Sequence, residues 1–185
     1  MPEPMVKATP VNGLVSFVRR ELTPDQLKSA LAALGPDQAR LFGGELLANE
    51  QVPLGLVNQF TKAAAAQKGE DVEHFAIRAG RFGADLGLKT VYKFIMALLS
   101  PQSVLRTAPM MWKKVYDSGQ MIVEPGDNSA TIHVRQFVPD PAGCGRITGW
   151  FSVIAEKSAK NPKIVHAKCG ARGDAECIWQ FHWTS

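Results

Sequence analysis

The sequence lacks long hydrophobic runs. Among its 185 residues no apolar stretch approaches the roughly 20 residues that a membrane-spanning helix needs, and the longest, Val91 to Leu99, is interrupted by Lys93. The first ten residues contain prolines and charges but no apolar signal core. We therefore expect a cytoplasmic protein with a flexible N-terminus over residues 1–10 and a single domain over residues 11–185.

Recognisable catalytic motifs are also missing. The chain has no glycine-rich nucleotide-binding fingerprint, no Gly-x-Ser-x-Gly elbow and no His-Glu-x-x-His pair. Its acidic residues show no paired arrangement that would supply a general acid and a general base. We therefore predict that the protein is not an enzyme.

Basic residues are not concentrated in any one segment. The chain has 21 lysines and arginines against 17 acidic residues, a net charge of +4, and no run of basic residues longer than two. A nucleic-acid-binding domain usually gathers its basic residues on one face. The scattered pattern predicts a solvated surface, and we do not expect a nucleic-acid partner.

Helices are indicated in the first two thirds of the chain. Apolar residues recur at helical spacing after the cap residues Thr23 and Ser100, each of which is followed by proline. A short strand is predicted at Val11–Phe17. The predicted helices cover residues 23–34, 37–48, 53–67, 70–86, 88–99 and 101–117.

The periodicity changes after Gly119. Four strands are predicted around one further helix, in the order 121–124, 130–137, helix 144–158, 163–169 and 176–183. A run of helices followed by hairpins indicates an α+β fold. We expect the N-terminal helices to pack with a four- to five-stranded antiparallel sheet, whose C-terminal part has the order β-β-α-β-β.

Two of the predicted helices offer faces for close packing. The helix over residues 70–86 contains Gly80 and Gly83, each of which lowers helix propensity by about 1 kcal/mol. Such residues are typical where a neighbouring helix or a ligand approaches the backbone. The helix over residues 101–117 carries an apolar stripe. We predict a homodimer that buries one of these two helices.

The three cysteines, Cys144, Cys169 and Cys177, lie in the last quarter of the chain, and an odd number cannot all form internal disulfides. Cys169 and Cys177 flank Gly173 at equal spacing, which predicts that they face each other across a hairpin. Three interpretations stay open: buried thiols, a zinc site with Cys144 as the third ligand, and a redox disulfide.

A closed zinc site would need a fourth ligand. Glu124, Asp127 and His166 are the candidates nearby in the sequence. Strand alternation predicts that Val165 and Ala167 lie on the face of the second hairpin cysteine and that His166 points to the opposite side. We therefore favour a carboxylate over His166.

The stretch from Gly87 to Trp183 resembles the 4-vinyl-reductase-like domain, which shares a superfamily with haem-NO-binding domains and Bet3-like vesicle-tethering subunits. The N-terminal half, from Val11 to Leu86, resembles a myxobacterial paralogous family of unknown function with this fold. The likeness of the C-terminal stretch rests on Ser100-Pro101, Trp112, Tyr116-Asp117-Ser118-Gly119, Cys144, Gly149-Trp150 and the segment from Cys169 to Cys177.

The resemblance implies a set of metal ligands. In related aromatic-sensing activators three cysteines and a glutamate hold zinc, and the matching positions here are Cys144, Cys169 and Cys177, with Glu124 as the glutamate. Haem-binding relatives carry a Tyr-x-Ser-x-Arg motif, but Gln120 stands in place of the arginine and no helical histidine is well placed. We therefore do not expect haem.

The resemblance also predicts a function. We expect a non-catalytic sensory or regulatory domain that binds a small apolar molecule or lipid and acts through a protein partner. The alternatives are a dimerising scaffold of the Bet3-like type without a ligand, and an accessory protein in tetrapyrrole reduction. An apolar pocket is expected among residues of the central helices, namely Phe75, Phe82, Val91, Ile95, Leu105, Met111 and Trp112.

Overall fold

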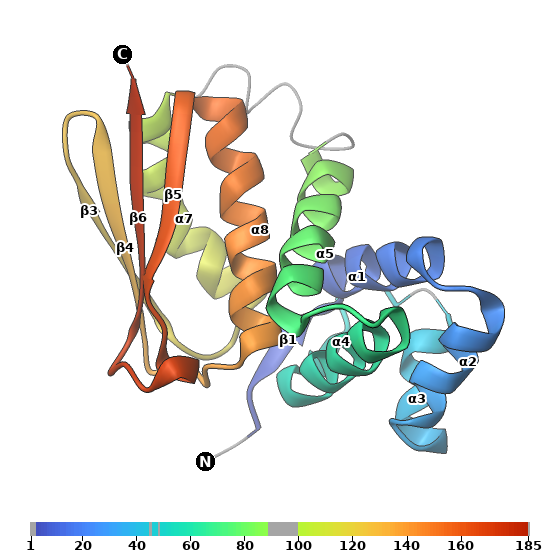
Figure 1. Ribbon diagram of the computed structural model, residues 1–185. Coiled ribbons are helices and arrows are strands. Elements are labelled where there is room, and N and C mark those ends of the chain that lie inside the picture. Colours follow the sequence, from blue (N-terminus) through green and yellow to red (C-terminus); the bar gives the residue numbers. More distant parts are fainter. Residues whose placement is uncertain (1–2, 45, 48, 89–99, 185) are drawn as a thin grey trace.

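The computed structural model describes residues 3–44, 46–47, 49–88 and 100–184 and has helices in its N-terminal half and a sheet in its C-terminal half (Figure 1). The predicted α+β class is confirmed. The predicted helix over residues 88–99 lies almost wholly outside the described residues. No helix within the described ranges is both long and apolar enough to cross a membrane.

The N-terminal half consists of five helices and a two-stranded sheet. Thr23 caps the second helix with a capping box, in which its hydroxyl oxygen accepts a hydrogen bond from the Gln26 amide while the Gln26 side chain accepts one from the Thr23 amide. The elements are β1 Met5–Lys7, α1 Ala8–Glu21, α2 Pro24–Ala32, α3 Pro36–Gly43, β2 Gln51–Pro53, α4 Leu54–Lys68 and α5 Val72–Gly87.

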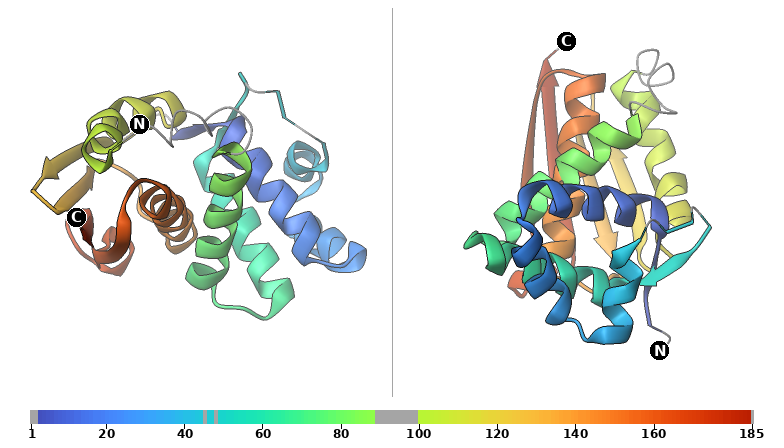
Figure 2. Two further views of the ribbon diagram at one scale, coloured as in Figure 1. Left: turned by 90° about the horizontal axis from the view of Figure 1, so that it is seen from above. Right: turned by 90° about the vertical axis from the view of Figure 1, so that its right-hand side faces the viewer.

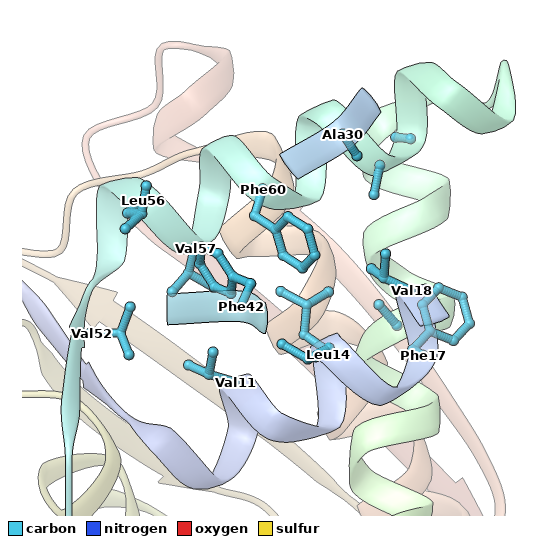
Figure 3. Close-up of a cluster of buried hydrophobic side chains, with 14 of the residues drawn as sticks. Val11, Leu14, Phe17, Val18, Ala30, Phe42, Val52, Leu56, Val57 and Phe60 are labelled. Atoms are coloured by element: carbon cyan, nitrogen blue, oxygen red, sulfur yellow. The ribbon is translucent and has the colours of Figure 1, made fainter. Parts of the chain in front are cut away.

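One hydrophobic core joins these helices. Figure 3 shows side chains from α1, α3 and α4 meeting in its centre. The rings of Phe42 and Phe60 stack with their centroids 4.3 Å apart, and Phe17 meets Phe75 of α5 edge-on at 5.2 Å. This half of the molecule therefore has a packed interior of its own.

Two sequence predictions for the N-terminus are wrong. The segment Val11–Phe17 is helical, because Val11, Leu14 and Val18 follow a helical period and all three are buried on one side of α1. Residues 5–7, expected in a flexible tail, form β1, which pairs antiparallel with β2 and makes a further bridge from Val6 to Tyr116.

The C-terminal half is a four-stranded antiparallel sheet in the order β3-β4-β6-β5. Two helices, α7 and α8, cover one face of it and share its core (Figure 1). The elements are α7 Pro101–Val115, β3 Gln120–Pro125, β4 Ser129–Arg135, α8 Pro141–Ser158, β5 Lys160–Lys168 and β6 Cys177–Thr184.

The buried face of β5 is the opposite of the predicted one. Ile164 pairs with Phe181 and His166 with Trp179, so these residues lie on the core side, whereas Val165 is 55% exposed. The pairing is irregular between His166 and Lys168, which inserts one residue into the alternation. A shift of one residue moves each side chain to the other face.

The two halves meet where α5 packs on α8, with their backbones in contact. Figure 2 shows α8 between the sheet and α5, and α5 between α8 and α1. A Cβ atom on Gly80 would overlap the Arg146 carbonyl, and one on Gly149 would overlap the Ile77 carbonyl. The glycines of the predicted 70–86 helix therefore serve a neighbouring helix. The predicted homodimer stays a prediction, but this glycine face is already covered by α8.

We expect Gly149→Ala to lower the free energy of unfolding by about 2 kcal/mol or more, because the added methyl group has to displace helix backbone. Gly55→Ala is the matched control in a helix, since the nearest atom to its added Cβ is a flexible Glu3 oxygen at 3.7 Å. Urea denaturation of both variants tests this, and equal stability of the two would contradict direct packing of α5 on α8.

Candidate functional site

Four potential metal ligands converge at the end of the sheet nearest the start of α8. Cys144 lies in the first turn of α8, Cys177 begins β6, and His166 and Cys169 lie near the end of β5. One ligand atom from each residue lies within 4.8 Å of the corresponding atoms of the other three. We call these four residues the Cys3His cluster.

The cluster has the dimensions of a tetrahedral metal site. The sulfur atoms of Cys144 and Cys177 are 3.8 Å apart. Zinc–sulfur bonds of about 2.3 Å in a tetrahedron give a sulfur–sulfur edge of about 3.8 Å. The three cysteines are free and no more than 3% exposed, and the His166 side chain is 6% exposed. The site is therefore dry and closed.

His166 is positioned by an aromatic neighbour. Its imidazole stacks on the Trp179 indole with ring centroids 4.2 Å apart and an angle of 2° between the planes. Both of its ring nitrogens are buried without a hydrogen-bond partner within the described ranges. The nearest carboxylate, that of Glu73, is 3.9 Å from Nδ1. Because buried polar atoms are nearly always satisfied in proteins, an imidazole without a hydrogen bond beside three thiols is suited to binding a metal ion.

The thiols also polarise one another. A hydrogen bond from the Cys144 thiol lowers the pKa of Cys177 to about 4 against the opposing effect of burial, with further help from His166 and the Gly170 amide. The same pairing raises the pKa of Cys144. The thiolate, which is the metal-binding form of cysteine, is therefore favoured at Cys177.

The fourth member of the Cys3His cluster is His166 and not Glu124, the ligand predicted from the sequence. Glu124 lies on β3 with its side chain 66% exposed, and its carboxylate is 3.5 Å from His133 and outside the cluster. His166 takes that place, because the irregularity after it brings Cys169 to the face that His166 occupies. Uninterrupted strand alternation was the faulty assumption.

A second buried polar group lies on α8, two residues beyond Cys144. Arg146 is only 8% exposed. Its Nη1 donates to the Thr61 hydroxyl and its Nη2 to the Asn58 side-chain oxygen, both at 2.7 Å. Burial lowers the pKa of Arg146 and raises that of Tyr116, whose aromatic ring lies nearby.

Arg146 is one of the residues that line a small cavity between α1, α5 and α8, which we call the crevice. Its volume is about 20 Å³. Its lining includes Val11, Leu14, Ala79, Tyr116, Arg146 and Trp150. Arg146 is not among the residues predicted from the sequence, although a charged residue between Gly145 and Gly149, in the apolar and small-residue part of the helix, is a usable signal.

The predicted apolar pocket does not coincide with the crevice. Phe75 and Phe82 pack in the N-terminal core, whereas Leu105 and Trp112 belong to the C-terminal core. Met111 is half-buried on α7. Val91 and Ile95 lie outside the described residues, so a pocket among these seven residues stays a prediction.

Comparison with known proteins connects this fold to one group. No protein-family model matches the sequence and no curated protein matches it. Among solved structures, the chain is similar to an H-NOX protein from S. oneidensis in the Fe(II)NO ligation state, with a TM-score of 0.74, 11% identity, and coverage of 97% of this chain and 99% of that one.

Two further solved structures give the same result. An oxygen-binding H-NOX domain related to soluble guanylate cyclases has a TM-score of 0.72 and 10% identity, covering 97% of this chain and 95% of that one. A protein studied for the effect of porphyrin distortion on haem redox potential has a TM-score of 0.69 and 12% identity, covering 96% of this chain and 99% of that one. The chain therefore has an H-NOX-like fold.

These comparisons contradict one expectation from the sequence. The replacement of the motif arginine by Gln120 leads us not to expect haem, but the structures that share the fold include proteins described by their haem or Fe(II) state. That expectation is wrong and we withdraw it. The crevice, at about 20 Å³, is smaller than a porphyrin, so its lining does not fit that group in this structure.

We expect Thr61→Val to lower the free energy of unfolding by about 1–3 kcal/mol, because it removes an acceptor from the buried Arg146 guanidinium. Thr107→Val is the control. Both hydroxyls donate a hydrogen bond to a carbonyl of their own helix, Thr61 to Val57 and Thr107 to Val104, but the Thr107 hydroxyl is exposed and accepts no bond from a described arginine. A similar effect of both substitutions in urea denaturation would show that the Arg146 contact contributes nothing.

Proposed function

We propose that this chain is a non-catalytic sensory domain that binds a small molecule and acts through a protein partner, and that a zinc ion bound by Cys144, His166, Cys169 and Cys177 fixes its C-terminal hairpin to α8. The observation that carries the proposal is the Cys3His cluster, whose ligand atoms all lie within 4.8 Å of one another. Three thiolates and one imidazole form a closed structural zinc set.

The sensory role is supported by the fold and by the position of α8. Solved proteins with this fold are described with bound oxygen or NO, over nearly the whole length of the chain. Helix α8 carries Cys144 towards the sheet and Arg146 towards the crevice. A ligand in the crevice that shifts α8 would therefore also move the zinc ligand and the hairpin attached to it.

Zinc would contribute to stability rather than to a reaction. With four protein ligands the metal keeps no open position for a substrate. Its role would be to join the first turn of α8 to both strands of the terminal hairpin beside their connecting loop. The binding free energy of such an ion adds to the free energy of unfolding.

Elemental analysis of protein that has never met a chelator is expected to give one zinc ion per chain. His166→Ala should reduce the zinc content, and Glu124→Gln, the matched control from the earlier ligand prediction, should retain it. A zinc content well below one in the wild type, or equal loss in both variants, would contradict the site.

A chelator serves as the second readout of the same site. It should lower the melting temperature of the wild-type protein, because removing a ligand of the folded state lowers the apparent stability. Cys169→Ser should melt early and respond little to chelator. If chelator leaves the wild type unchanged, the cluster is a set of buried thiols.

Native mass spectrometry of protein isolated from its own host tests the sensory role. We expect a fraction of the chains to carry a small molecule in addition to zinc. The same protein after denaturation and refolding with zinc alone is the control, and should lack the extra mass. If the host protein shows only the zinc mass, we would prefer a scaffold role to that of a sensor.

A further inference from the structure

Arg146 is a buried positive charge that lines the crevice and has no salt bridge among the described residues. Only 8% of Arg146 is exposed, and no ion pair joins it to any described carboxylate. The carboxylate that begins α8, Asp140, is already engaged by Lys62 Nζ at 2.5 Å and by the Ala142 amide at 2.9 Å. A desolvated cation with neutral partners is costly in a protein interior.

The guanidinium also has hydrogen-bonding capacity to spare. It offers five N–H donors, and its bonds to Thr61 and Asn58 use two of them. Those two partners hold the group rigidly against α4, with Thr61 fully buried and Asn58 5% exposed. Because Arg146 also belongs to the lining of the crevice, this fixed, planar group of donors is suited to bidentate binding of a planar oxyanion.

The remaining lining determines the size and polarity of the ligand. The cavity volume of about 20 Å³ exceeds the 10–15 Å³ that one water molecule needs, so the crevice admits only a ligand of very few atoms. Tyr116 and Trp150 bring further polar groups to the lining, and burial raises the pKa of Tyr116, which keeps its hydroxyl protonated as a donor. Val11, Leu14 and Ala79 close the cavity with apolar groups.

We propose that the crevice is a binding site for a small monovalent planar oxyanion of the size of formate or nitrite, bound by the Arg146 guanidinium and the Tyr116 hydroxyl. The inference names the ligand class for the proposed sensory domain and rests on that proposal for its biological meaning. The two sites use different side chains of α8, so each can be tested by its own variants.

The test is isothermal titration of the zinc-loaded full chain with sodium formate and sodium nitrite at constant ionic strength. Saturable binding is expected for both anions. Chloride lacks the planar pair of oxygens, and propionate exceeds the cavity, so both should bind about tenfold more weakly or not at all. Absence of saturable binding of formate and nitrite to folded protein would overturn the proposal.

Variants locate the site. Arg146→Met should weaken formate binding about tenfold or more, and Tyr116→Phe by a smaller factor. Arg81→Gln is the control, since Arg81 is an exposed arginine of α5 that pairs with Glu156. If Arg146→Met does not fold, Arg146→Lys keeps the charge and should lose the preference for planar oxyanions over chloride. Unchanged affinity in Tyr116→Phe together with an unchanged preference in Arg146→Lys would overturn the assignment.

Zinc content measured on each variant separates the two proposals. Loss of anion binding in Arg146→Met with one zinc per chain supports the anion site. Wild-type protein that holds zinc but binds neither anion contradicts the anion site and leaves the zinc-fixed domain standing. Wild-type protein that binds formate but lacks zinc contradicts the metal centre alone.

Discussion

The backbone contact between α5 and α8 is the constraint on which the rest of the structure depends. Gly80, Gly145 and Gly149 bring the two helices so close that a Cβ at these positions would meet the opposing helix. Side chains cannot be inserted there without separating the two halves. This contact fixes α8 between the sheet and the helical half (Figure 2), and both candidate sites lie on that helix.

Helix α8 uses its sides for different purposes. Towards the sheet it presents Cys144 and a set of apolar residues that complete the C-terminal core, with Phe151 edge-on to Trp179 at 5.4 Å. Away from the sheet it presents Arg146, which is bonded to α4, and Trp150, which lines the crevice. Because one rigid helix joins the crevice to the Cys3His cluster, displacement at one site has a direct mechanical route to the other.

Both sites contain buried polar groups whose structural cost is evident. The imidazole of His166 is stacked and buried with no hydrogen bond to either nitrogen within the described chain, and the guanidinium of Arg146 is buried with hydrogen bonds to neutral groups. Apolar residues of similar volume would stabilise a simple core at least as well. The two features are therefore better explained by ligands than by packing.

The sequence by itself determined the α+β class, the helix starts at Thr23 and Ser100, the close packing of the glycine-bearing helix and the approach of Cys169 to Cys177 across the terminal hairpin. These follow from local signals, because caps, periodicity and small residues act within a few positions of the chain. Tertiary structure decided the remainder. One inserted residue in β5 moved His166 to the face of Cys169, and the long-range contact of α8 with α4 buried Arg146 beside Asn58 and Thr61. Neither could be derived from local pattern, because strand register and burial depend on partners far away in the chain.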